Sequence, residues 1–180
     1  ICNVNRAIDH NQFRMDYLVH QQINPKYQND IIENGGTIHY VPGIKTGVIK
    51  YIKEIFRFYK VHNDYHIVHL NECGASFFLY ALPLLFTSRM KLIVHSHNGN
   101  SSRRIAHKIF ACFQNLRVNR KCACSDVAAA WMFGKKTLRA KDYTIVHNGI
   151  QVERYRYRPE ISEKLKSEFG LEGKFVLGSV

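Results

Sequence analysis

Short runs typical of β-strands, several of them rich in Val and Ile, alternate along this chain with longer stretches whose apolar residues recur at helical spacing. The short runs predict strands at residues 13–20, 36–42, 65–70, 91–97, 121–125 and 143–149. The longer stretches predict helices at residues 25–34, 46–61, 74–88, 101–119 and 125–133. Such alternation is typical of a mainly parallel sheet with helices on both faces. We therefore expect an α/β, doubly wound, Rossmann-like fold.

Several helix boundaries carry local signals. Ser125 is as well suited to cap the helix that follows it as to contact a ligand, and Gly134 can end that helix. A further helix is expected to start at Pro159 and to stop at Gly170. These signals indicate a folded chain but not a function.

Small and polar residues follow four of the predicted strands. In a doubly wound sheet, ligands bind beyond the carboxyl ends of the strands, so these residues are expected to face one crevice. They are Asn71, Glu72, Cys73, Gly74, His97, Asn98, Gly99, Asn100, Ser125, Asp126, Asn148 and Gly149. His97 stands at the end of its strand, at the mouth of that crevice, whereas His95 is expected to be a satisfied core histidine.

The 180 residues suit one domain, and 46% apolar residues are enough for a substantial core. The formal net charge of +12 predicts an anionic partner. No acidic residue lies between Glu72 and Asp126, a stretch that contains eight Lys and Arg residues. The basic helices at 46–61 and 101–119 either have an ordinary solvated face or contact anionic lipid. We expect packing helices with weak membrane association, and no nucleic-acid partner, because no reading module is present.

Metal and dinucleotide sites find little support. His95 with His97 and Cys122 with Cys124 could in principle bind zinc, but these spacings match no common zinc module. No Gly-rich phosphate-binding loop is present. The five cysteines have no disulfide-scaffold spacing and suit a reducing compartment. The longest apolar run, residues 77–86, is too short to span a bilayer.

Several segments together resemble bacterial glycosyltransferases of family 4, of the capsular and exopolysaccharide type. They are "LIVHSHN" at residues 92–98, "CACSDVAAAWMFG" at 122–134, the stretch from 143 to 180, and the strands at 13–20 and 36–42. The segments cover nearly the whole chain in the family's order. The resemblance implies a GT-B fold, in which two Rossmann-like domains face each other across a cleft.

Within that fold the chain resembles the N-terminal, acceptor-binding domain, which would occupy residues 1–173. Residues 174–180 would begin the linker or first strand of a C-terminal, donor-binding domain. The family's first strand, which is central in the sheet, would precede Ile1. Its loss would expose two strand edges, which the tail at residues 174–180 could fill within the molecule or by exchange between chains. A homodimer through an exposed sheet edge is therefore also expected.

The resemblance also implies roles for individual residues. His97 matches a family histidine that hydrogen-bonds and positions the reacting groups. Asn71, Glu72, Asn98, Gly99, Arg103 and Arg104 would form the acceptor side, and Ser125, Asn148 and Gly149 the side facing the cleft and donor. Arg103 and Arg104 suit an anionic lipid-linked acceptor, although both could equally face solvent. Gln151 stands where the family commonly has Asp, so this position is left out of the site.

The implied activity is sugar transfer with retention of configuration, without a metal or other cofactor. The donor would be a nucleotide-sugar such as a UDP-sugar or GDP-sugar, held mainly by the C-terminal domain. The acceptor would be lipid-linked or a polysaccharide, and the enzyme would be cytoplasmic and peripheral at the inner face of the membrane. The alternative is a non-catalytic basic module that binds anionic membrane or nucleic acid.

We predict that residues 1–180 alone transfer no sugar, because the donor site would lie in the other domain. Calorimetric titration of the purified chain with UDP and UDP-glucose should give little or no heat. Micromolar binding, or sugar transfer by the chain alone, would contradict this prediction and would place a nucleotide in the crevice around His97.

Overall fold

The computed structural model describes residues 2–72, 74, 78–86, 89–100, 104–113, 115–150 and 152–177. They belong to two compact units, residues 1–148 and residues 149–180. The domain boundary expected at residues 173 and 174 stays a prediction.

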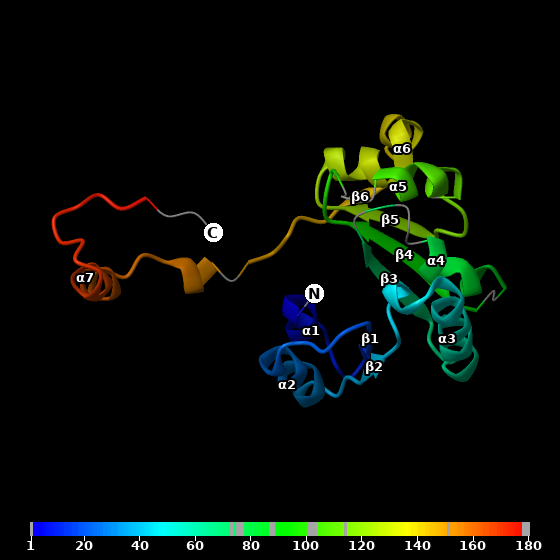
Figure 1. The fold of residues 1–180 in the computed structure, drawn as a ribbon, viewed down its shortest axis with the longest axis horizontal. Coiled ribbons are helices and arrows are strands. Elements are labelled where there is room, and N and C mark those ends of the chain that lie inside the picture. Colours follow the sequence, from blue (N-terminus) through cyan, green and yellow to red (C-terminus); the bar gives the residue numbers. More distant parts are fainter. Residues whose placement is uncertain are drawn as a thin grey trace. The chain divides into compact units, whose positions relative to one another are not determined.

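The first unit contains two parallel sheets (Figure 1). In one sheet β1 (Tyr17–Val19) pairs with β2 (Ile38–Tyr40). The other has the order β3 (Ile67–Glu72), β4 (Lys91–Ser96), β5 (Arg120–Ala123) and β6 (Thr144–Ile145). All six predicted strands are present, most of them shorter than predicted. Parallel sheets flanked by helices confirm the α/β, Rossmann-like fold class.

Six α-helices of this unit lie within the described residues. They are α1 (Cys2–Ala7), α2 (Pro25–Glu33), α3 (Val48–Val61), α4 (Phe78–Ala81), α5 (Arg104–Phe110) and α6 (Asp126–Ala140). Three short 3-10 helices accompany them, η1 (Ile44–Thr46), η3 (Leu82–Phe86) and η4 (Ala111–Phe113). The helices predicted at 25–34 and 46–61 correspond to α2 and to η1 with α3.

Two helix predictions need correction. The described part of residues 74–88 changes from α4 to the 3-10 helix η3 near Pro83, because proline lacks the amide hydrogen that a continued α-helix requires. The helix expected to reach residue 119 leaves α-helical geometry after Phe110, and Arg117 has a φ of 64°. Gly134 ends the first helical segment of α6 as predicted, because its φ of 84° is not helical, and a second segment continues beyond this kink to Ala140.

The core lies between β4 and its covering helices. Leu92 and Val94 of β4 are fully buried, as are Tyr51 and Ile55 of α3. The helix α6 packs on β4 and β5 and adds its own buried apolar side chains, Ala128, Ala129, Met132 and Phe133. This packing holds β4 rigidly, so the residues at its carboxyl end have fixed positions.

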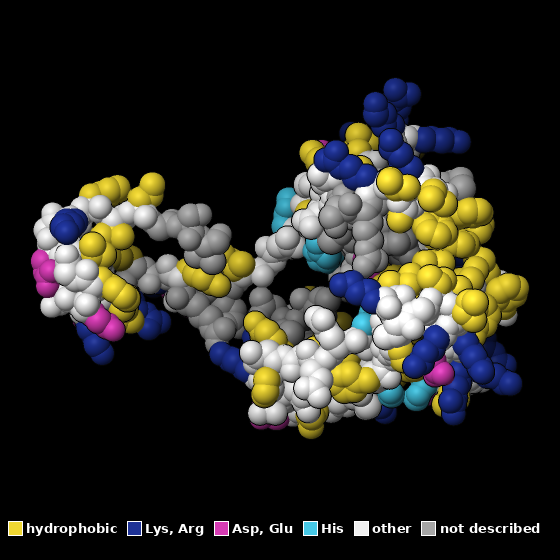
Figure 2. Space-filling model, viewed as in Figure 1, with side chains coloured by type: hydrophobic (Ala, Val, Ile, Leu, Met, Phe, Trp, Pro, Cys, Tyr) yellow, Lys and Arg dark blue, Asp and Glu magenta, His cyan; other side chains and the backbone are white. Residues whose placement is uncertain are grey.

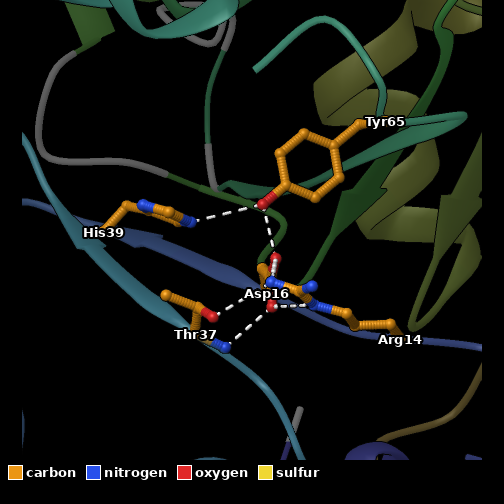
Figure 3. Close-up of polar contacts among 5 residues, drawn as sticks. All are labelled: Arg14, Asp16, Thr37, His39 and Tyr65. Carbon is orange, nitrogen blue, oxygen red and sulfur yellow. Dashed lines mark hydrogen bonds and ion pairs between the residues drawn. The ribbon is translucent and has the colours of Figure 1, made fainter. Parts of the chain in front are cut away.

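The carboxylate of Asp16 joins the two sheets. Among the described residues, β1 and β2 share no backbone hydrogen bond with β3. The Tyr65 hydroxyl, just before β3, donates to Asp16 Oδ2 at 2.5 Å (Figure 3). Asp16 also accepts from the backbone N–H of Thr37 at 2.7 Å and from the guanidinium of Arg14 at 3.0 and 3.1 Å. His39 Nε2 lies 3.3 Å from the same Tyr65 hydroxyl. One side chain thus connects the starts of three strands.

Burial raises the pKa of Asp16, but the hydrogen bonds from Tyr65, Arg14 and Thr37 outweigh it and hold the pKa below its usual value of 3.8. The same environment raises the pKa of Tyr65, through burial first and through its bond to Asp16 second. Tyr65 therefore stays protonated and acts as the donor. The pair is a partly buried, charge-assisted hydrogen bond.

The second unit contains the 3-10 helix η5 (Val152–Tyr155) and α7 (Pro159–Glu168). Pro159 stands in the first turn of α7, as predicted. Residues 174–177 belong to no strand, and Phe175 is 93% exposed. The prediction that the tail fills a gap within the molecule is therefore wrong for these residues, while exchange between chains stays a prediction.

Replacing Asp16 with Asn should lower the free energy of unfolding by about 2 kcal/mol at neutral pH, the usual contribution of hydrogen bonds to a charged group. Because the folded pKa of Asp16 is depressed, its contribution is complete above about pH 4 and is lost as pH falls further. Denaturant unfolding at pH 7 and at pH 3 measures both effects.

The matched control is Asp64→Asn, because Asp64 is exposed. The stability gap between wild type and Asp16→Asn should narrow at pH 3. Equal effects of the two substitutions at pH 7 would show that the Asp16 network does not hold the sheets together.

Candidate functional site

The site lies at the carboxyl ends of β3 and β4. These strands are parallel neighbours in which Asn71 pairs with His95 and Glu72 with Ser96. His97 directly follows β4, so its side chain is the first beyond the sheet on that strand. This is the edge of a parallel sheet at which ligands bind in doubly wound folds.

Two amide side chains hold the imidazole of His97. Its Nε2 lies 2.9 Å from Asn71 Oδ1, and its Nδ1 lies 3.0 Å from Asn148 Oδ1. Asn71 comes from β3 and Asn148 from the chain after β6, so both partners are distant from His97 in sequence. Contacts at both ring nitrogens fix the rotation of the ring.

The chemistry of these partners limits what His97 can do. An amide can present its oxygen or its nitrogen, so it can serve as acceptor or donor to either ring nitrogen. Neither partner is a carboxylate, the group that stabilises an imidazolium ion in a catalytic triad. The arrangement therefore suits hydrogen bonding and positioning of a substrate more than removal of a proton.

Two further histidines lie beneath His97. The rings of His95 and His97 are 4.2 Å apart, and the rings of His69 and His95 stack at 5.6 Å. Burial, followed by repulsion from His97, lowers the pKa of His95, so it is neutral at pH 7. His95 is a core residue, as expected, and it bonds the backbone of Val146. Its Nε2 is buried without a partner, so the expectation of a fully satisfied histidine is only half right.

The loop after His97 is held by short-range contacts. The Ser96 hydroxyl donates to the carbonyl of Asn98 at 3.3 Å, and the Cys124 thiol donates to the carbonyl of His97 at 3.2 Å. Gly99 lies against α6, where an added Cβ would come within 2.5 Å of Val127 Cγ1. Asn98 and Gly99 are exposed beside His97, and their part in an acceptor site stays a prediction.

Other predicted site residues have different local roles. Ser125 Oγ accepts from the N–H of Ala128 at 3.2 Å and caps α6. Arg104 donates through Nε to Asn100 Oδ1 at 3.3 Å in an exposed position. Glu72 is half-buried at the end of β3. Arg103 lies outside the described residues.

The asparagines expected on the acceptor side and on the cleft side, Asn71 and Asn148, both bond the same ring. Their assignment to the two sides stays a prediction. Gly149 begins the second unit and has open space around it. The contact from Cys124 was not foreseen, because the cysteines were interpreted as packed or as zinc ligands. Strand pairing alone brings residues so distant in sequence together, and no local motif signals it.

The described residues contain no group of three or more His, Cys, Asp or Glu side chains that could hold a metal ion. Among the same residues, no helix combines the length and the apolar composition needed to cross a membrane.

The chain is similar to a protein of Bacillus subtilis (strain 168) named "Putative glycosyltransferase EpsF". The two are 21% identical over 188 aligned residues, which include the whole of this chain and 49% of the relative. The chain therefore spans about half the length of this relative. No family model matches the chain, and no solved structure matches it. The similarity supports a relationship to glycosyltransferases.

We predict that Gly99→Ala destabilises the fold by about 1 kcal/mol, because its new methyl group would overlap Val127 and β-branched valine adjusts poorly. In the double variant Gly99→Ala/Val127→Ala, the clash is removed and the cost of the Gly99 substitution should largely disappear. Denaturant unfolding of the two single variants and the double variant gives the coupling. Additive effects would show that Gly99 does not lie against Val127.

Proposed function

We propose that this chain is the acceptor-binding half of a retaining glycosyltransferase of family 4 with the GT-B fold. The whole enzyme would transfer a sugar, with hexosyltransferase-like chemistry, from a nucleotide-sugar to a lipid-linked or polysaccharide acceptor. The observation that carries the proposal is His97, held by two amides at the ligand-binding edge of a Rossmann-like sheet. The similarity to EpsF over the whole chain gives independent support.

In this proposal His97 binds a hydroxyl of the reacting sugars. Either amide contact, at 2.9 or 3.0 Å, has the length of the hydrogen bond that a hydroxyl would form in its place. When a substrate hydroxyl replaces one of the two asparagine contacts, the other asparagine still holds the imidazole ring of His97. The hydroxyl therefore bonds a group that is already oriented. Such prior orientation lowers the entropic part of the barrier.

The acceptor proton has to leave when its oxygen attacks the sugar. His97 has amide partners and no carboxylate partner among its contacts, so it is poorly supported as the final proton holder. We therefore assign the proton to the departing phosphate of the donor. The donor itself would be held mainly by a second domain, which corresponds to the part of EpsF that this chain does not span.

The second candidate, a non-catalytic basic module, is favoured by the net charge of +12. An anionic membrane is its best partner, and for the proposed enzyme the same charge would place it at the inner face of the cell membrane. The two candidates differ in one property. The enzyme needs His97 for sugar transfer, whereas a binding module has no transfer activity to lose.

In the longer protein that this proposal implies, His97→Ala should lower the rate of sugar transfer about 100-fold, the typical loss for one oriented hydrogen-bonding group. The matched control is His66→Ala, because His66 is exposed just before β3, at the opposite end of that strand. Transfer of labelled sugar from a nucleotide-sugar to membrane lipids or polysaccharide measures both variants.

Asn71→Ala and Asn148→Ala should each reduce the rate less than His97→Ala, because one amide still holds the ring. Wild-type rates in His97→Ala, with the protein folded, would remove His97 from the site. No transfer by the wild-type protein to any lipid or polysaccharide fraction would favour the binding module.

A further inference from the structure

The outward face of α3 alternates apolar and basic side chains. Ile49, Lys53, Phe56 and Lys60 follow one another at spacings of four, three and four residues, which places them in one row along the helix. All four are exposed, Ile49 by 85%. The opposite face of α3 is buried in the core through Tyr51, Ile55 and Tyr59, so this row belongs to the exposed side of the helix.

The apolar surface continues from α3 onto η3. The rings of Phe56 and Phe86 lie 5.9 Å apart, and Phe86 is 77% exposed. We call these five residues, Ile49, Lys53, Phe56, Lys60 and Phe86, the docking surface. Figure 2 shows hydrophobic side chains gathered over η3 and the α5–η4 segment, with Lys and Arg side chains of α3 beside them.

The helix α5 also presents exposed apolar side chains beside a lysine. Ile105 and Ile109, one turn apart, are 77% and 61% exposed, and Lys108 between them is also exposed. Phe78 of α4 stacks on Phe113 of η4 with ring centres 4.8 Å apart, which joins the two helical segments. Exposed apolar side chains that lie together in this way favour an interaction site.

The charge of this region indicates the kind of partner. No acidic residue occurs between Glu72 and Asp126, and Glu54 is the single acid of α3. The centres of protein–protein interfaces are poor in lysine, whereas here Lys53 and Lys60 lie among the apolar side chains. Lysine at a bilayer surface places its aliphatic stem along the acyl chains and its ammonium at the phosphates.

We propose that the docking surface binds the surface of an anionic bilayer. Ile49, Phe56 and Phe86 enter the boundary between headgroups and acyl chains, and Lys53 and Lys60 pair with lipid phosphates. The docking surface extends the proposed function, because a lipid-linked acceptor would lie in the same membrane. Only this purpose of the surface rests on the proposed function. The binding itself needs neither donor nor acceptor.

The test is sedimentation of the chain of residues 1–180 with vesicles of phosphatidylcholine, with and without phosphatidylglycerol. We expect binding to the anionic vesicles alone, and weaker binding as salt screens the charges. Lys53→Glu/Lys60→Glu should lower the partition coefficient at least about tenfold, given the usual attraction of each basic residue to an anionic surface. Ile49→Ser/Phe86→Ser should lower it as well, at unchanged charge.

The matched control is Lys135→Glu/Lys136→Glu on α6, which changes the net charge by the same amount at exposed positions. Thermal unfolding establishes that each variant is folded. An equal loss in both charge-reversal variants would mean that only net charge matters and would overturn the docking surface. Absence of wild-type binding to anionic vesicles would overturn it too.

Self-association of the chain that Ile49→Ser/Phe86→Ser abolishes, without vesicle binding, would show that a second copy occupies this face. None of these results depends on sugar transfer. If the longer protein binds vesicles but transfers no sugar, only the proposed function is contradicted. If it transfers sugar but does not bind vesicles, only the docking surface is contradicted.

Discussion

The partly buried hydrogen bond from Tyr65 to Asp16 is the contact on which the arrangement of the first unit depends. The strands β1 and β3 belong to different sheets, so no backbone ladder fixes them relative to each other. Asp16 compensates because one carboxylate bonds residues at the starts of β1, β2 and β3. Its depressed pKa keeps it ionised at neutral pH, where these bonds are strongest.

The same strand connects this polar contact with the candidate site. Tyr65 precedes β3, and Asn71 near its other end bonds the imidazole of His97. The position of β3 therefore governs how His97 is held, while packing of α6 on β4 fixes the backbone from which His97 projects. A site built on strand ends gains rigidity from the sheet, which suits a group whose task is orientation.

Much of this could be predicted from the sequence, because local patterns determine local structure. The short apolar runs predicted all six strands, Ser125 predicted the cap of α6, and Gly134 predicted the break in that helix. Helix lengths were predicted less well around Pro83 and after Phe110, because backbone geometry there ends the α-helix although the apolar spacing continues. His97 was chosen from its place after a strand, but its bond to Asn148 joins residues far apart in sequence. Only the completed sheet brings these two side chains together, so no local pattern could reveal their contact.

His97 is the group proposed to contact the transferred sugar, and the docking surface is proposed to hold the protein at the membrane. A structure of the longer protein with an intact nucleotide-sugar bound tests this claim most directly. We predict that a ring nitrogen of His97 lies about 3 Å from a hydroxyl of the bound sugar, the length of a hydrogen bond. A donor whose sugar lies away from His97, with both amide contacts of the ring unchanged, would contradict the account.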